Sequence, residues 1–202
     1  MQIETVIFDL GGVLIDWEPR RLFSKIFDDE ADMEYFLNNI CTPDWNVQQD
    51  AGRPLAEATQ ILVDRFPKYA TQIEAFYGRW EEMLGGAILP TVEILEELIE
   101  AQTHRVYALT NWSAETFPVA LRDYDFLQWF EGILVSGDEK MMKPQPEIYD
   151  LVCKRYDINP ATAVFIDDSL KNIRGCEDYG MQGIHFKSGE QLRRDLQVLD
   201  IL

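Results

Sequence analysis

Short apolar runs recur along the chain, and polar residues lie on both sides of each. Runs of this kind predict strands that are buried on both faces, as in parallel sheets. The predicted strands are Thr5–Phe8, Arg105–Leu109, Gly132–Val135, Ala163–Ile166 and Gly183–Phe186. Apolar residues recur with helical spacing over Thr91–Ala101, Ala114–Tyr124, Pro146–Tyr156 and Leu170–Tyr179. This alternation predicts an α/β fold, a doubly wound parallel sheet of about five strands with helices on both faces.

Residues 17–88 break this alternation. They show no convincing strand, and their predicted helices are Arg20–Phe27, Met33–Ile40, Leu55–Phe66 and Ile73–Leu84. A crossover between parallel strands needs only about 10–12 residues, so we predict that 17–88 form a helical cap subdomain inserted into a core made of 1–16 and 89–202. Gly85 and Gly86 would form the hinge by which the chain returns. Insertions at this edge commonly act as lids that exclude water; a helical layer that only adds stability is the alternative.

Polar side chains follow the apolar runs where the predicted strands end. Asp9 comes directly after the first strand, Thr110 after the second, and Asp167 and Asp168 after the fourth, while Lys143 lies in a loop before a proline. Parallel strands share their carboxyl ends at one edge of the sheet, where open α/β sheets bind ligands, so we expect these residues to meet there. Each alone is also compatible with a turn or a helix cap, but together they favour a functional site.

The chemistry of these side chains favours a divalent cation. Carboxylates that lie close together raise each other's pKa unless a cation lies among them. Mg²⁺ suits this role because it binds one or two carboxylates together with water and phosphate oxygens. Lys143 would neutralise an attacking carboxylate and the transferred group. Thr110 would donate a hydrogen bond to a phosphate oxygen and Asn111 would orient its neighbours, with a helix N-cap as the alternative for both.

The composition excludes some classes of binding partner and indicates the compartment. Lysine and arginine number 18 against 36 aspartates and glutamates, a net charge of −18. This charge repels nucleic acid and anionic membranes, so we expect neither as a partner, and an anionic substrate needs a local cation. Three cysteines, without any CxxC pattern, predict free thiols in a reducing compartment. The opening MQIETVIF does not resemble a signal peptide and no run is long enough to span a membrane, so we expect a cytoplasmic protein, a monomer or a homodimer.

Four short motifs in this order resemble those of the haloacid dehalogenase superfamily of aspartate-nucleophile hydrolases. They are FDLGGV at 8–13, LTN at 109–111, KP at 143–144 and DDSLKN at 167–172. Each is weak alone, but the ordered set is specific and covers nearly the whole chain. The inserted helices resemble the helical cap that follows the first motif in this superfamily. Within it, the DLGG form with a TN second motif is most similar to the group around glucose-1-phosphate phosphatase and the amino-terminal domain of epoxide hydrolase.

The resemblance implies a role for each matching residue in a phosphatase that acts on a small phosphorylated metabolite, such as a sugar phosphate. Asp9 would attack phosphorus and form an aspartyl-phosphate that water then hydrolyses. Thr110 would bind the phosphate, with Asn111 beside it. Lys143 would pair with Asp9 and the phosphate. Asn172 would brace the motif loop from the following helix.

The same resemblance implies a Mg²⁺ site. The ion would be held by the Asp9 carboxylate, the Gly11 backbone carbonyl and Asp168, with Asp167 acting through water. One departure concerns Gly11, because the family has a second aspartate two residues after the nucleophile, and that aspartate protonates the leaving group. Losing a positioned proton donor costs roughly 10²–10⁴ in rate. Asp16 or a residue of the cap would have to replace it.

Two other functions remain compatible with the sequence. The 2-haloacid dehalogenases share the fold and the nucleophile and lack an acid two positions later, but they work without metal and resemble one another in having Ser and Asn where this chain has Asp167 and Asp168. A catalytically weak protein that binds phosphate as a sensor or scaffold is the second alternative, and Gly11 supports it. The two retained acids favour metal and therefore a phosphatase.

Substrate specificity is expected to lie in the cap and in the loops under it. Trp112 follows the second motif and is predicted to line the pocket. Arg20 and Arg53 are candidates for binding anionic groups of the substrate. Trp17 and Trp45 would either contact the substrate or pack the cap onto the core.

Overall fold

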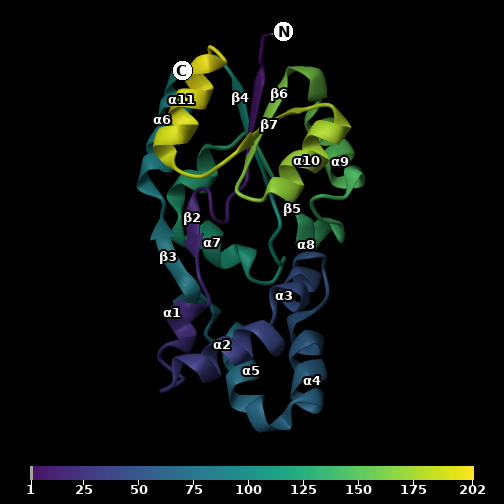
Figure 1. Cartoon of the computed structure of the whole chain (residues 1–202). Coiled ribbons are helices and arrows are strands. Elements are labelled where there is room, and N and C mark those ends of the chain that lie inside the picture. Colours follow the sequence, from purple (N-terminus) through teal and green to yellow (C-terminus); the bar gives the residue numbers. More distant parts are fainter. Residues whose placement is uncertain (1) are drawn as a thin grey trace.

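The computed structural model describes residues 2–202 and contains a sheet at one end and a group of helices at the other (Figure 1). The sheet has five strands in the order β5-β4-β1-β6-β7, and all of its neighbours pair in parallel. The strands are β1 (Thr5–Phe8), β4 (Arg105–Thr110), β5 (Gly132–Val135), β6 (Ala163–Asp167) and β7 (Gln182–His185). The predicted fold class is therefore confirmed, with β7 one residue earlier than its sequence pattern suggests.

Strand β1 lies at the centre of the sheet because its side chains are apolar on both faces. Phe8 is level with Ala108 on one neighbouring strand and with Ile166 on the other. Phe8 belongs to the apolar cluster on one face and Ile7 to the cluster on the opposite face. Because Phe8 is paired with Ile166 in a parallel register, the next residues, Asp9 and Asp167, lie at the same edge of the sheet.

Helices cover both faces of the sheet, as predicted (Figure 1). On one side are α6 (Leu89–Ala101) and α11 (Gly189–Val198), which contact each other, and on the other are α9 (Pro146–Tyr156) and α10 (Leu170–Tyr179). Two shorter helices, α7 (Phe117–Asp123) and α8 (Ser136–Glu139), follow β4 and β5. Helix α7 begins later than predicted, which leaves 111–116 as a loop at the sheet edge.

The second group of helices is built from the inserted segment. Its helices are α1 (Arg20–Phe23), α2 (Glu30–Asn39), α3 (Pro43–Asp50), α4 (Leu55–Arg65) and α5 (Ala70–Gly78), with short 3₁₀ turns at Pro67–Tyr69 and Trp80–Met83. The sequence pattern missed α3 because Pro43 was interpreted as a break, whereas it occupies the first turn, where proline is tolerated. Thr42 caps this helix by accepting a hydrogen bond from the Trp45 backbone N–H at 3.1 Å.

The prediction of no strand in 17–88 is wrong. Strand β2 (Ile15–Trp17) pairs antiparallel with β3 (Leu84–Ala87), and this two-stranded ribbon joins the inserted helices to the sheet-containing part. The sequence LGGA carries no alternation of apolar and polar residues, so only its non-local pairing with β2 makes it a strand. The predicted helix Ile73–Leu84 ends at Gly78 for the same reason, because the chain must turn into β3.

The inserted helices also contact the sheet-containing part at a second place. The Ser136 hydroxyl donates a hydrogen bond to the carbonyl of Asp50, the last residue of α3, and the Leu55 backbone N–H donates to Glu115 Oε1 at 2.8 Å. The ribbon and this contact lie at different points of the insertion. Together they hold the helices over the edge where the strands end.

All three cysteines are buried and none forms a disulfide within residues 2–202. In that part of the chain, no helix is both long and apolar enough to cross a bilayer.

A glycine on the core side of this second contact offers a test of how tightly the loops at the sheet edge are packed there. A Cβ at Gly137 would overlap the Ala114 backbone N and lie 2.7 Å from the Trp112 carbonyl oxygen, so Gly137→Ala is expected to lower the free energy of unfolding by about 1–3 kcal/mol. Gly78→Ala is the control, because a Cβ there meets no described atom within 4 Å; it should leave stability unchanged or raise it by up to about 1 kcal/mol. Urea unfolding measures both, and equal stability of the two variants contradicts the packing.

Candidate active site

Three carboxylates converge where β1 and β6 end. Asp9 follows β1, Asp167 is the last residue of β6 and Asp168 follows it, and each offers an oxygen that lies within 4.8 Å of the other two. These side chains meet because β1 and β6 are parallel neighbours that end at the same level. Residues that are 158 positions apart in the chain are thereby brought into one cluster.

The ammonium of Lys143 lies among these carboxylates. Its Nζ is 2.8 Å from Asp9 Oδ1 and 2.7 Å from Asp167 Oδ2, and it donates a third hydrogen bond to the Leu109 carbonyl at 3.0 Å. Lys143 and Asp167 are fully buried, and Asp9 is nearly so. An ammonium group has three N–H donors, and all of them are engaged here, so direct contact with a phosphate would require one of these partners to be exchanged.

The cluster carries more negative than positive charge. Burial raises the pKa of Asp9 to about 8, although Lys143 acts in the opposite direction. Burial also raises the pKa of Asp168. For Lys143, burial acts to lower the pKa, but the charges of Asp167 and Asp9 outweigh it and raise the pKa. Because three carboxylates face one ammonium, a further cation would balance the charge of the cluster. Oxygen atoms such as those of carboxylates are the ligands that Mg²⁺ prefers.

Two asparagines hold the charged groups in position. Asn172 on α10 donates from Nδ2 to both carboxylate oxygens of Asp167 at 3.1 Å. Asn111 holds the backbone of Lys143 in both directions: its Nδ2 donates to the Lys143 carbonyl at 3.0 Å and its Oδ1 accepts from the Lys143 N–H at 2.9 Å. The backbone N–H of Ser169 adds a hydrogen bond to Asp167 at 2.7 Å. These contacts make Asp167 and Lys143 the rigid part of the cluster.

The glycines after Asp9 shape the loop beside the cluster. Gly12 adopts φ +74°, and a Cβ there would lie 2.5 Å from Asp168 Oδ2, so only glycine allows this approach. Gly11 faces the cavity described below, and a Cβ built on it meets no described atom within 4 Å. Thr110 is fully buried and lies outside the cavity lining; its Oγ1 has no hydrogen-bond partner among residues 2–202.

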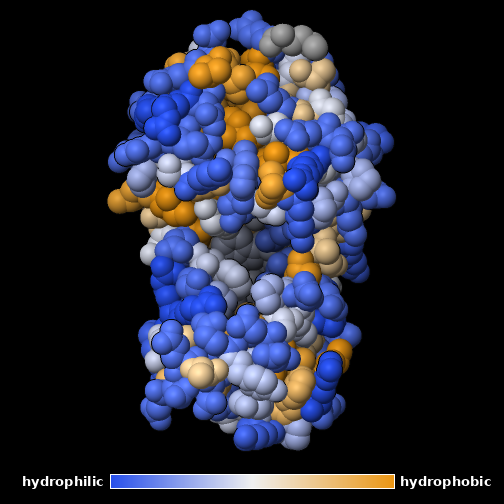
Figure 2. All heavy atoms as spheres, in the orientation of Figure 1, coloured by the Kyte–Doolittle hydropathy of each residue, from blue (hydrophilic) through white to orange (hydrophobic). Residues whose placement is uncertain are grey.

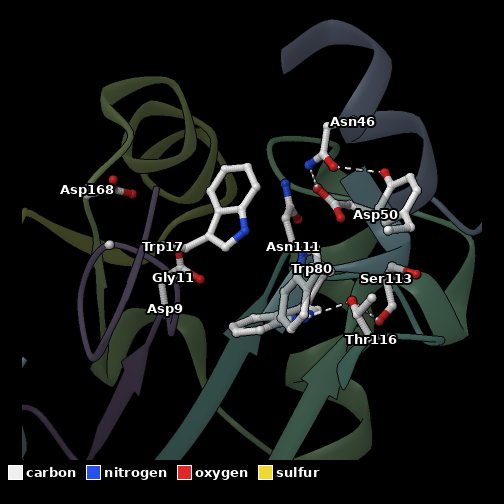
Figure 3. A pocket seen from close by; sticks show the side chains of 13 residues that line it. Asp9, Gly11, Trp17, Asn46, Asp50, Trp80, Asn111, Ser113, Thr116 and Asp168 are labelled. Atoms are coloured by element: carbon white, nitrogen blue, oxygen red, sulfur yellow. Dashed lines mark hydrogen bonds between the residues drawn. The ribbon is translucent and has the colours of Figure 1, made fainter. Parts of the chain in front are cut away.

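A cavity of about 240 Å³ opens above the cluster, between the sheet edge and the inserted helices. The molecule is visibly hollowed between these two parts in Figure 2. Figure 3 shows the lining side chains, with Asp9 and Asp168 on one side and Asn46 and Asp50 on the other. The sheet-containing part contributes Asp9, Gly11, Gly12, Asn111, Trp112, Ser113, Thr116 and Asp168, and residues 17–88 contribute Trp17, Asn46, Asp50, Tyr77 and Trp80.

The residues predicted to bind substrate lie in different places. Trp112 lines the cavity, where its Nε1 donates to Thr116 Oγ1 at 3.1 Å and its ring packs edge-on against Trp80. Arg20 is exposed on α1 and pairs with Glu34 at 2.6 Å. The guanidinium of Arg53 is bound by Gln49 and Gln48, each at 2.8 Å. Both arginines are satisfied by local partners and lie outside the cavity.

Sequence reasoning missed the residues of α3 and α5 that face the sheet edge. Asp50 is the last residue of α3, and burial raises its pKa to about 7, opposed by the Ser113 backbone N–H and the charge of Lys143. Asn46, one turn earlier, is linked to Tyr77 by a hydrogen bond of 2.9 Å. No local pattern marked these residues, because only the docking of the helices turns them toward the cluster. Trp17 also lines the cavity, and its Nε1 is buried without a partner in the described chain.

Known proteins resemble most of this chain. The sequence profile of the haloacid dehalogenase-like hydrolases matches residues 3–180. A sesquiterpene phosphatase of Aspergillus oryzae is 28% identical over 186 residues, which cover 90% of this chain and 89% of that protein. A phosphorylated carbohydrates phosphatase of Thermotoga maritima is 25% identical over 187 residues, or 91% of this chain and 84% of that one. A haloacid dehalogenase family enzyme of Bacteroides thetaiotaomicron, solved with magnesium and inorganic phosphate, superposes with a TM-score of 0.68 at 26% identity, covering 93% of this chain and 96% of that one.

The buried ammonium makes a strong prediction about stability. Lys143→Met leaves two adjacent carboxylates without their counter-ion, so the free energy of unfolding, measured in urea without divalent cations, should fall by about 3–5 kcal/mol. Lys154→Met is the matched control, because Lys154 pairs with Asp150 at 2.7 Å on the surface; the loss there should stay below about 1 kcal/mol. Equal losses for the two variants would show that Lys143 is not a structural counter-ion.

Proposed function

Because the chain belongs to the haloacid dehalogenase-like hydrolase family, we propose that it is a Mg²⁺-dependent phosphatase that hydrolyses a small phosphorylated metabolite, a sugar phosphate, through an aspartyl-phosphate on Asp9. The observation that carries this proposal is the cluster of three carboxylates and one ammonium at the base of a cavity between the sheet edge and the inserted helices. Phosphatases among its relatives support it. The two acids at 167 and 168 favour phosphatase over metal-independent dehalogenase chemistry, for which the nucleophilic aspartate suffices.

The residues present fit a magnesium ion. Asp9 and Asp168 would bind it through carboxylate oxygens and Gly11 through its carbonyl, while Asp167, already bound by Lys143 and Asn172, would act through water. When bound, Mg²⁺ neutralises the excess negative charge and draws charge from the phosphate oxygens. An oxygen-donor cluster with excess negative charge is the environment this ion requires.

The side chains of the cluster divide the reaction between them. An Asp9 oxygen attacks phosphorus, a new P–O bond forms, and the bond to the substrate oxygen breaks as that oxygen takes up a proton. Water then attacks the aspartyl-phosphate, which releases inorganic phosphate and restores Asp9. Lys143 keeps Asp9 oriented through the 2.8 Å contact and favours its ionised form, the form that attacks. Thr110 would donate to a phosphate oxygen from Oγ1, a buried hydroxyl that has no hydrogen-bond partner among residues 2–202.

The cavity walls support a sugar as the leaving group. Trp17, Trp80 and Trp112 offer aromatic surfaces to the apolar side of a sugar ring, and Asn46 and Asp50 offer hydrogen bonds to hydroxyls. The Thermotoga maritima relative is named for phosphorylated carbohydrates. Because the Aspergillus oryzae relative is named for sesquiterpenes, a substrate panel should include a prenyl phosphate beside the sugar phosphates. We propose that the enzyme acts in the cytoplasm as a monomer or homodimer.

Removing the nucleophile tests the reaction. Asp9→Asn should lower Mg²⁺-dependent phosphate release from the substrate panel by at least about 10³-fold, because an amide does not attack phosphorus. Asp64→Asn, on the exposed side of α4, is the control and should keep wild-type activity. Circular dichroism checks that both variants are folded. Retained turnover in Asp9→Asn would reject Asp9 as the nucleophile, and halide release from 2-chloropropionate would identify a dehalogenase instead.

Removing a metal ligand tests the cation site. Asp168→Asn should weaken Mg²⁺ binding by roughly tenfold or more, because a carboxylate in the cluster becomes a neutral amide. Asp178→Asn makes the same change at an exposed position on α10 and should leave the Kd unchanged. Isothermal titration of each protein with MgCl₂ measures the difference. Equal affinities in the two variants would place the ion elsewhere.

A further inference from the structure

The proposed reaction lacks a proton donor at the position where the family has one. Position 11 is glycine, so the loop after Asp9 carries no acid that reaches the leaving oxygen. Four residues lining the cavity carry titratable side chains: Asp9, Asp168, Asp50 and Tyr77. Asp9 is the nucleophile and Asp168 belongs to the cation site. The Tyr77 hydroxyl donates to Asn46 and accepts from Gln49, each at 2.9 Å. Asp50 is therefore the acid of the cavity lining that has no other role in the proposed reaction.

Asp50 is held at the cavity by one contact of its backbone and one of its side chain. Its backbone carbonyl accepts a hydrogen bond from the Ser136 hydroxyl of the sheet-containing part, which fixes the end of α3. Its carboxyl group receives a long hydrogen bond of 3.4 Å from Asn46 Nδ2, one turn earlier on the same helix. Figure 3 shows this carboxyl group on the opposite side of the pocket from Asp9. These contacts fix the position of Asp50, whereas an acid on the open surface has no such restraints.

The in-line geometry of phosphoryl transfer decides on which side of the cavity an acid is needed. In phosphoryl transfer the attacking and leaving oxygens lie roughly in line on opposite sides of phosphorus. Asp9 attacks from the sheet edge, so the leaving oxygen points away from the sheet and toward the inserted helices. Asp50 enters the cavity from that side. An acid placed there faces the atom that must gain a proton.

We propose that Asp50 is the catalytic acid of this enzyme and supplies from the inserted helices the proton that position 11 does not supply; the assignment rests on the proposed phosphatase function. As the bond from Asp9 to phosphorus forms and the bond to the substrate oxygen breaks, the Asp50 proton passes to that oxygen. The resulting carboxylate accepts a proton from the water that attacks the aspartyl-phosphate. Asp50 thus gives one proton and regains one in each turnover.

The surroundings of Asp50 agree with this role. Burial raises its pKa to about 7, while the Ser113 backbone N–H and the charge of Lys143 act to lower it. A general acid works best when its pKa is near the operating pH, because it then holds a proton and releases it readily. The neighbouring side chains that face it, Asn46 and Tyr77, are uncharged near neutrality, and burial raises the pKa of Tyr77 further.

The test compares two phosphate esters in the first turnover. Asp50→Asn keeps the shape and loses the proton, so release of the alcohol from a sugar phosphate that the wild type hydrolyses should slow by about 10²–10⁴-fold. Release of 4-nitrophenol from 4-nitrophenyl phosphate should change little, because nitrophenolate leaves without a proton. Rapid mixing with excess enzyme isolates this step from hydrolysis of the aspartyl-phosphate. Asp44→Asn, an exposed position on the same helix, should match the wild type on both esters.

Two further variants separate chemistry from structure. Asp50→Glu retains an acid and should keep most of the sugar phosphate activity that Asp50→Asn loses. The double variant Gly11→Asp/Asp50→Asn should release the alcohol at least roughly tenfold faster than Asp50→Asn alone. Position 11 accepts a side chain because it has open space around it and its backbone lies outside the left-handed region.

The possible outcomes distinguish the two proposals. Equal loss on both esters, or a raised KM with an unchanged first-turnover rate, would overturn the assignment of Asp50 while the phosphatase function stands. A wild-type protein that releases phosphate from no ester in the panel would overturn the proposed function itself, and the role of Asp50 with it.

Discussion

The ammonium of Lys143 is shared by two buried carboxylates, and the geometry of the whole site depends on this contact. Asp9 and Asp167 lie on neighbouring strands, and their charges would repel each other in a buried environment without a cation between them. Lys143 comes from a different loop, whose backbone is held by Asn111. One ion-pair network therefore links three segments of the chain. Asp168, the most exposed of the three acids in the cluster, lies outside this network, and we propose that it binds a further cation.

The inserted helices complete the site. They are attached through the ribbon of β2 and β3 and held again by the contacts of Asp50 with Ser136 and of Leu55 with Glu115. This second contact brings α3 over the cluster, where its residues form one wall of the cavity. Asp9, which we propose as the nucleophile, and Asp50, which we propose as the acid, belong to different parts of the chain, so the proposed reaction requires that the helices are docked. In this proposal the inserted helices supply the acid, which is consistent with a glycine at position 11.

The sequence predicted which acids lie together at the sheet edge where a strong local signal met a general rule of the fold. Apolar runs followed by Asp9, Thr110 and Asp167 identified three central strands. The rule that parallel strands share one edge predicted that the acids lie together there, as they do. Arg20 and Arg53 show where such reasoning fails. Their charge suggested substrate binding, but nearby glutamates and glutamines bind them within the inserted helices. Strand β3 and helix α3 were missed because their local patterns are weak and their positions depend on distant partners.

The sequence by itself determined the α/β core, the order of its motifs and which acidic side chains lie at the sheet edge, because buried strands require apolar runs and their ends are set by local residues. Only the tertiary structure decided which residues of 17–88 face the cluster, that all three donors of Lys143 are engaged, and that Asp50 lies opposite Asp9. The physical reason is that docking of the helices depends on contacts between residues far apart in the chain, such as Ser136 with Asp50, and no short-range pattern encodes them.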